Sequence, residues 1–355
     1  MVLSFMEPLP YKMIDEMMHA IIMLFSQFIL CGAYLFALDF SNHLTLLSGG
    51  DRPGSNYSIM TNPFGLDSVP VSSSGRIIRH RAFPSRFVDS RNIDVWLPDG
   101  YDEKKKYAVL YMHDGQMLFD SATTWNSSEW GVDETMSRLL KDGRIRDCIV
   151  VGIWNSGAGR HADYFPQQPF AMMTETEQAV VYGSDRNNGQ TVFNGAPVRS
   201  DGYLRFLVSE LKPFIDKNYS THRGRENTFI AGSSMGGLIS LYAACTYPDV
   251  FGGAACLSTH WPGVFFVDGN PFPPTMLSYL RDRLPAPGRT IFYFDHGDRG
   301  IDALYPPLQR EVDQLMRARG YSDRNFRSLF FAGADHNEKA WASRLHESLL
   351  FLLRP

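Results

Sequence analysis

The sequence predicts an α/β fold, in which a mostly parallel central sheet is covered by helices on both faces. From residue 75 onward, short apolar runs alternate with segments of helical periodicity, and this alternation is typical of strands joined by helical crossovers. Six of the runs are continuously apolar, as expected for strands that are covered on both faces. Two further strands joined by a turn come first, so the sheet should begin with an antiparallel pair.

Eight short segments are predicted to form the strands. They span residues 76–83, 92–97, 107–112, 148–154, 228–231, 252–257, 290–294 and 327–331. Two segments between them repeat apolar residues at helical spacing. One carries Leu204, Leu207, Leu211, Phe214 and Ile215, and the other carries Leu304, Leu308, Val312, Leu315 and Met316 and ends before Gly320.

Residues 155–201 interrupt this alternation. The segment is long and polar, with Pro, Gln, Gly and Asn throughout. It follows a predicted parallel strand, and α/β sheets bind their ligands at the carboxyl ends of such strands. We expect a lid or a wall of the substrate pocket, with a disordered surface insertion as the equal alternative.

The N-terminal region differs from the rest of the chain. Residues 17–38 carry no formal charge apart from a possible contribution of His19, and this mainly apolar stretch of 22 residues is long enough to span a bilayer or to form a signal peptide. The alternative is a buried helix of the fold. We expect an apolar leader (1–38) and a flexible linker (39–74) before a catalytic domain (75–355). We therefore expect a protein that is exported (periplasmic or extracellular) or anchored to a membrane through residues 17–38. If the translation start site is misassigned, the protein would be cytoplasmic.

The composition narrows the function classes. The chain has 355 residues, of which 44% are hydrophobic, so it can bury a large core, and its net charge of −4 comes without a basic cluster. Nucleic acid is therefore not an expected partner. Buried free thiols are predicted for the four cysteines, Cys31, Cys148, Cys245 and Cys256. Neither Cys-x-x-Cys nor His-Glu-x-x-His occurs, so no metal site is predicted.

The most informative motif is Gly232-Ser233-Ser234-Met235-Gly236, which follows a predicted strand and precedes a helix-forming stretch. A Gly-x-Ser-x-Gly turn in that context is a nucleophile elbow, in which small residues let strand and helix approach closely. Ser234 is therefore a candidate covalent nucleophile, and the chain a candidate hydrolase or acyltransferase. The alternative is a glycine-rich turn that only packs a helix on a strand.

A serine nucleophile needs a base and an acid that orients the base, which follow the serine along the chain in the order acid, then histidine. His336 follows the last predicted strand and is the candidate base, unless it is merely an exposed loop histidine. Three carboxylates compete for the acid position. Asp295 ends a strand and suits a structural role. Asp302 is our first choice, although it could be a helix N-cap, and Asp298 is the second.

Further residues are assigned by their place after strands. The oxyanion hole should use the backbone N–H groups of Met235, which follows the serine, and of Gln116, in the turn after the third strand. Substrate contacts are expected from residues that follow strands, because these should line the pocket. They are Asn155, Arg160, Tyr164, His260 and Trp261.

Five segments together resemble the putative-esterase family of the α/β-hydrolase superfamily, which includes esterase D, feruloyl and acetyl-xylan esterases, enterochelin esterases and the antigen 85 mycolyltransferases. They are residues 111–116, 149–153, 232–237, 297–302, and 336–338 with Trp341. The resemblance implies an α/β-hydrolase fold and a serine esterase without a cofactor. It also favours Asp302, because the family's acid precedes a helix that carries a glutamine two turns later, here Gln309.

The expected activity is hydrolysis of a small acyl or aryl ester through an acyl-enzyme, with a carbohydrate or siderophore ester as a candidate substrate. An acyltransferase would use the same triad and differ only in its acceptor. A serine peptidase is less favoured, since no gating domain is present. A catalytically silent binding module is the remaining alternative, and the presence of both Ser234 and His336 argues against it.

Overall fold

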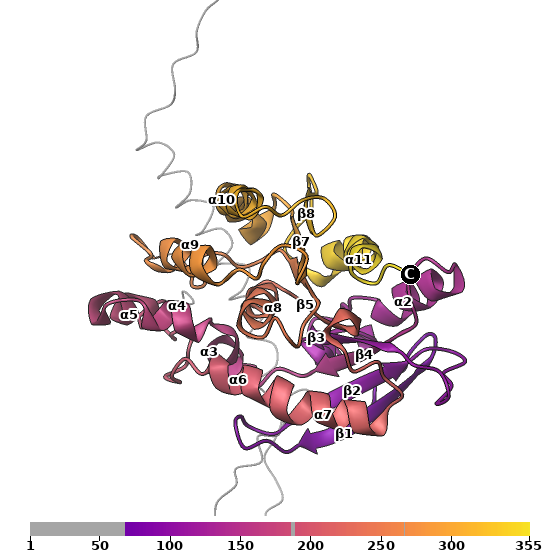
Figure 1. Cartoon of the computed structure of the whole chain (residues 1–355). Helices are drawn as coiled ribbons and strands as arrows, with labels where there is room; N and C mark the ends of the chain where they lie inside the picture. Colours follow the sequence, from indigo (N-terminus) through magenta and orange to yellow (C-terminus); the bar gives the residue numbers. More distant parts are fainter. Residues whose placement is uncertain (1–67, 186–188, 266) are drawn as a thin grey trace, which may run out of the picture. The chain divides into compact units, whose positions relative to one another are not determined.

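The computed structural model describes residues 68–185, 189–265 and 267–355, all within one compact unit, Thr61–Pro355. Eight strands form one sheet in the order β1-β2-β4-β3-β5-β6-β7-β8 (Figure 1). They are β1 (Arg76–Phe83), β2 (Arg91–Leu97), β3 (Ala108–His113), β4 (Cys148–Ile153), β5 (Thr228–Ser233), β6 (Gly253–Leu257), β7 (Ile291–His296) and β8 (Phe326–Phe330).

Strand directions follow the predicted pattern. β1 pairs antiparallel with β2, and β2 antiparallel with β4. All later pairs are parallel. The predicted α/β fold with a mostly parallel sheet is therefore confirmed, and the predicted strand ends differ from the observed ones by two residues at most.

The helices divide between the two faces of the sheet (Figure 1). Their bounds are α2 (Val132–Lys141), α3 (Arg160–Tyr164), α4 (Gln167–Ala171), α5 (Glu175–Tyr182), α6 (Ser200–Phe206), α7 (Lys212–Asn218), α8 (Met235–Thr246), α9 (Phe272–Arg283), α10 (Tyr305–Ala318) and α11 (Glu338–Leu352). Apolar residues of α2 and α11 join one core cluster, and those of α6 to α10 join the other. The sheet therefore lies between two apolar layers.

The central strands contribute to both layers. In β3, Val109 and Tyr111 belong to the cluster with α8, whereas Leu110 and Met112 belong to the cluster with α2 and α11. None of these four side chains is more than 1% exposed. Successive side chains of a strand point to opposite faces, so a strand that is covered on both faces must be apolar throughout. This requirement produced the continuous runs in the sequence.

The insertion 155–201 is folded in its described part. It forms α3, α4, α5 and the start of α6, and Phe165, Val181 and Phe193 belong to the main apolar core. Buried Asp163 binds the insertion to the sheet, because it accepts hydrogen bonds from Arg91 at the start of β2 and from Arg199. The alternative of a disordered surface insertion therefore does not hold for these residues.

The predicted leader (1–38) and most of the predicted linker lie outside the described residues. Within the described ranges, no helix is both long and apolar enough to cross a membrane. The last part of the predicted linker, residues 68–74, is hydrogen-bonded to the catalytic domain. Val71 N–H donates to Asp120, and the Ser73 N–H and hydroxyl both donate to Asp133. This contradicts a flexible linker up to residue 74, because these donors are held by buried or capping carboxylates.

The described cysteines behave as predicted. Cys148, Cys245 and Cys256 are buried free thiols, and burial raises the pKa of each thiol. A thiol that stays protonated and covered is unreactive. Cys31 lies outside the described residues.

Candidate active site

Ser234 lies in a strained turn between β5 and α8. Its backbone angles are φ 57° and ψ −123°, a conformation that L-residues avoid unless the surrounding structure imposes it. Ser234 N–H donates to the Leu257 carbonyl at 2.9 Å, and His260 N–H donates to the Ser234 carbonyl at 3.2 Å. A Cβ at Gly232 would lie 2.8 Å from the backbone of Gly236. A side chain at Gly232 would therefore force strand and helix apart, as the motif predicts.

The structure joins His336 to Asp302. His336 Nδ1 lies 2.5 Å from Asp302 Oδ1, and the other Asp302 oxygen accepts hydrogen bonds from Ser258 Oγ and Gly297 N–H, both at 2.7 Å. Burial alone would raise the pKa of Asp302, but the hydrogen bonds from His336 and Ser258 lower it. Asp302 therefore stays an anion beside the imidazole.

Asp298 is bound elsewhere. It accepts the N–H of Gly333 at 2.7 Å and lies 3.8 Å from Arg299 Nε. Of the two acids that the sequence left open, the structure brings only Asp302 into hydrogen-bonding contact with His336.

A buried polar network supports Asp302 from behind. Ser258, which donates to Asp302, accepts hydrogen bonds from Arg344 Nη2 at 2.8 Å and Trp341 Nε1 at 3.0 Å. Arg344 Nε also lies 3.1 Å from Asp295 Oδ1, so Asp295 has the structural role that its strand-end position suggested. The sequence analysis missed Ser258 and Arg344. A buried arginine on the apolar side of α11 was the available signal, because such a charge needs a carboxylate partner.

The two oxyanion candidates follow neighbouring strands. Met235 is the first residue of α8, after β5, and Gln116 lies in a short 3-10 helix, η1 (Gly115–Met117), after β3. β3 and β5 pair in the sheet, so both turns lie at the same carboxyl edge. A Cβ at Gly115 would lie 2.5 Å from Gly152 of β4. The turn is therefore pressed against the sheet, which holds Gln116 in place.

Asn155, Arg160 and Tyr164 all converge on Asp114. Arg160 binds the Asp114 carboxylate through Nε and Nη2 at 2.6 and 2.7 Å, and Asn155 Nδ2 donates to it at 2.7 Å. Tyr164 OH accepts the Asp114 N–H at 3.4 Å. Burial would raise the pKa of Asp114, but Arg160 and Asn155 lower it. Asp114 was not predicted as a site residue, although it lies beside the elbow, 3.3 Å from the position of a Cβ at Gly236.

The predicted substrate residues therefore divide into two groups. Asn155 and Arg160 are half-buried at the carboxyl edge of the sheet and stay candidates for substrate contact. Tyr164, His260 and Trp261 are buried, and each of their side chains is already hydrogen-bonded to another protein group. Trp261 Nε1 donates to Gln309 at 2.9 Å, for example. We no longer expect these three to line the pocket, because a covered side chain supports a site from behind.

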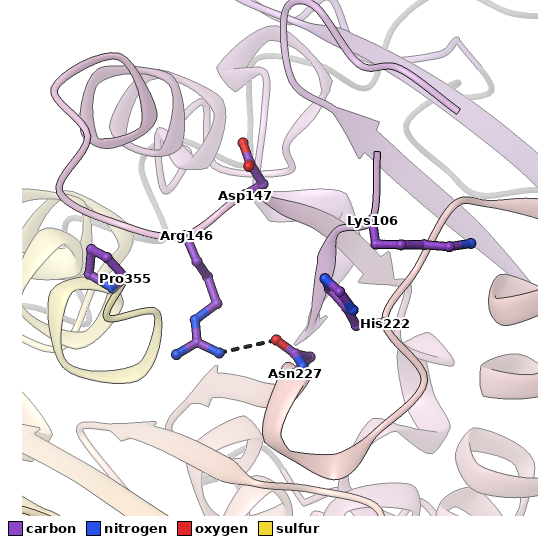
Figure 2. A pocket seen from close by; sticks show the side chains of 6 residues that line it. All are labelled: Lys106, Arg146, Asp147, His222, Asn227 and Pro355. Atoms are coloured by element: carbon purple, nitrogen blue, oxygen red, sulfur yellow. Dashed lines mark hydrogen bonds between the residues drawn. The ribbon is translucent and has the colours of Figure 1, made fainter. Parts of the chain in front are cut away.

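A pocket of about 310 Å³ lies at the other end of the sheet (Figure 2). Its lining includes Lys106, Asp147 and Asn227, which come just before β3, β4 and β5. It is therefore at the amino edge of the strands, whereas Ser234 and His336 follow strands at the carboxyl edge. Within the described ranges, no group of three or more His, Cys, Asp or Glu could hold a metal ion.

Known proteins resemble this chain over most of its length. Residues 85–352 match the family described as "Putative esterase". An uncharacterized protein, YbbA from Bacillus subtilis, is 22% identical over 285 residues, which are 78% of this chain and 96% of that protein. Ferri-bacillibactin esterase BesA from Bacillus subtilis is 36% identical over 170 residues, 45% of this chain and 51% of that protein.

Solved structures show the same fold. An IroE-like serine hydrolase from Shewanella oneidensis has a TM-score of 0.58 at 19% identity and covers 78% of this chain and 80% of its own. The feruloyl esterase module from Clostridium thermocellum has a TM-score of 0.54 at 18% identity, with 80% and 89% covered. With an 8-stranded, mostly parallel sheet and a family match that spans 85–352, this chain belongs to the Putative esterase family of the α/β-hydrolase superfamily and is a carboxylic ester hydrolase.

Proposed function

We propose that the protein is a serine esterase in which Ser234 is the nucleophile, His336 the general base and Asp302 the acid that orients the base. The observation that carries this proposal is the bond between His336 and Asp302 at the edge of the sheet where Ser234 occupies a strained elbow. Covalent catalysis by serine requires these three roles.

The proposed reaction has two steps. Ser234 Oγ attacks the ester carbonyl while His336 takes the hydroxyl proton, and His336 then gives that proton to the departing alcohol, which leaves an acyl-enzyme. Water attacks the acyl-enzyme with the help of His336, and the acid and Ser234 are released. Asp302 holds the imidazole in one tautomer and stabilises its positive charge.

The oxyanion of each tetrahedral intermediate would be held by the N–H groups of Met235 and Gln116. Met235 N–H lies at the N-terminus of α8, where the helix dipole also favours negative charge. Loss of one donor of this kind costs about 10²–10³-fold in turnover. The packing of η1 against β4 supports this assignment, since a fixed donor needs no rearrangement during the reaction.

We propose a small acyl or aryl ester as the substrate, with a carbohydrate or siderophore ester as the natural class. The support comes from relatives whose names state such activities. BesA is named a ferri-bacillibactin esterase, and a protein of Xylanibacter ruminicola that is 26% identical over 170 residues is named an endo-1,4-β-xylanase/feruloyl esterase. Those 170 residues are only 18% of the latter protein.

The test is hydrolysis of p-nitrophenyl acyl esters and methyl ferulate by the full chain, beside the variant Ser234→Ala. We expect turnover that falls on the order of 10⁴-fold or more in the variant, together with labelling of Ser234 by a fluorophosphonate. Ester cleavage that survives in Ser234→Ala would refute the nucleophile. Labelling without turnover would indicate acyl transfer to another acceptor, and neither labelling nor turnover would indicate a silent binding module.

A further inference from the structure

The Tyr305 side chain lies beside the proposed nucleophile and the proposed base, although the mechanism above gives it no role. Tyr305 is the first residue of α10 and is fully buried. Its hydroxyl lies 2.8 Å from His260 Nδ1. Burial raises the pKa of Tyr305, and the Ser234 hydroxyl beside it acts in the opposite direction. Its ring and the His336 imidazole form a T-shaped pair, with 5.8 Å between centroids and 73° between planes. The tyrosine therefore touches both the nucleophile and the base.

His260 is fixed beside the elbow and is neutral. Its backbone N–H donates to the Ser234 carbonyl, and its ring is 2% exposed with an edge-on contact to Tyr305. Burial, and then the charges of His161, His336 and Arg160, hold the pKa of His260 well below its ordinary value. A neutral imidazole can donate from Nδ1 to the tyrosine oxygen.

The direction of these hydrogen bonds follows from the reaction. Ser234 has a single hydroxyl proton, which must point to His336 for general-base catalysis. The hydroxyl oxygen of Ser234 can then only accept from Tyr305, so Tyr305 donates its own proton and its oxygen accepts from His260 Nδ1. This arrangement satisfies each hydroxyl with one donation and one acceptance.

We propose that Tyr305 is a further catalytic residue that donates a hydrogen bond to Ser234 Oγ, and that His260 is the positioning residue that fixes the Tyr305 hydroxyl. The inference rests on the proposed function. During acylation the Ser234 proton goes to His336, and Tyr305 keeps its proton throughout. In deacylation Ser234 Oγ is the leaving atom, so negative charge develops on it again while His336 returns the proton.

The Tyr305 hydrogen bond is therefore stronger in both transition states than in the resting enzyme, since hydrogen bonds to charged atoms are stronger than those to neutral ones. An interaction made mainly in the transition state changes kcat and leaves KM nearly constant. For Tyr305→Phe in the full chain we expect kcat on a p-nitrophenyl ester to fall about 10- to 100-fold, with KM within about twofold.

A matched pair of variants tests His260 without changing Tyr305. His260→Asn keeps an N–H donor near the position of Nδ1, whereas His260→Leu keeps the size and removes the donor. We expect the Asn variant to retain most of kcat and the Leu variant to lose as much as Tyr305→Phe. The double variant Tyr305→Phe/His260→Leu should be no slower than Tyr305→Phe alone, because His260 acts through the tyrosine.

Several results would overturn the inference. They are a Tyr305→Phe variant within twofold of wild type, a change in KM alone, or equal losses in the Asn and Leu variants of His260. Thermal unfolding of each variant identifies any that fail to fold, and the His260 pair still decides the question if Tyr305→Phe is one of them. Fluorophosphonate labelling separates the two proposals. If the wild type is labelled and hydrolyses the ester, and Tyr305→Phe is as active, only this inference is refuted. If the wild type is neither labelled nor active, the proposed function is refuted as well.

Discussion

Replacement of Asp302 by Asn tests the proposed triad most directly. The carboxylate accepts three hydrogen bonds, and its Oδ1 is 2.5 Å from His336 Nδ1. The variant keeps the shape but removes the charge that faces the imidazolium formed during attack. Two unit charges about 4 Å apart interact by about 4 kcal/mol at an effective dielectric constant of 20, and each 1.36 kcal/mol is tenfold in rate. We therefore expect kcat to fall by about 10³-fold.

The assay is steady-state hydrolysis of a p-nitrophenyl ester, with thermal unfolding to show that the variant is folded. KM should change little, because the lost interaction forms only as His336 becomes charged. Asp298→Asn is the matched control and should stay within about twofold of wild type, since Asp298 binds Gly333 N–H in the structure. A kcat within tenfold of wild type for Asp302→Asn, or equal losses in both variants, would refute the assignment.

Three more predictions concern stability and the substrate. Burial, and then the charge of Glu134, raises the pKa of Glu129 from 4.5 to about 7. Between these two pH values the folded state therefore binds more protons than the unfolded state. The free energy of unfolding consequently falls as pH rises through that window. Glu129→Gln should raise Tm at pH 8 and leave it nearly unchanged at pH 4, and an equal shift at both would contradict the reasoning. Arg160→Met leaves the Asp114 carboxylate without its bidentate partner and should cost about 3 kcal/mol in urea unfolding, which Asp114→Asn in the same chain should partly restore. Trp125 is 65% exposed and precedes Asn126, which donates a hydrogen bond to Glu338 near the proposed base. If Trp125 stacks on the aryl group of an ester, Trp125→Ala should raise KM for methyl ferulate more than for p-nitrophenyl acetate. Equal KM changes for the two esters would exclude this stacking role.

The sequence predicted the sheet because the central strands are covered on both faces and must be apolar along their whole length. β4, for example, is buried at all six positions. The candidate nucleophile was recognisable for a different reason. An elbow depends on local chain geometry, so Gly232 and Gly236 must lie within two residues of Ser234.

Contacts between distant parts of the chain left no such signal. Arg160 and Asp114 are 46 residues apart, and nothing near either residue indicates that they meet. The helices of the insertion were missed because α3 and α4 have only five residues each, too short for an apolar period to show. Asp302 and Asp298 are four residues apart in one turn, and only the path of that turn determines which of them reaches His336.

The ion pairs of Asp163 bear on the order in which the protein folds. Asp163 binds Arg91, 72 residues earlier, and Arg199, 36 residues later. Closing such long loops costs chain entropy before the contacts can compensate for it. A charge that is desolvated before its partners arrive is also destabilising. Residues 155–201 should therefore consolidate after the sheet has formed, and refolding monitored at Trp154, which precedes the insertion, should be slower than refolding monitored at Trp96 within β2.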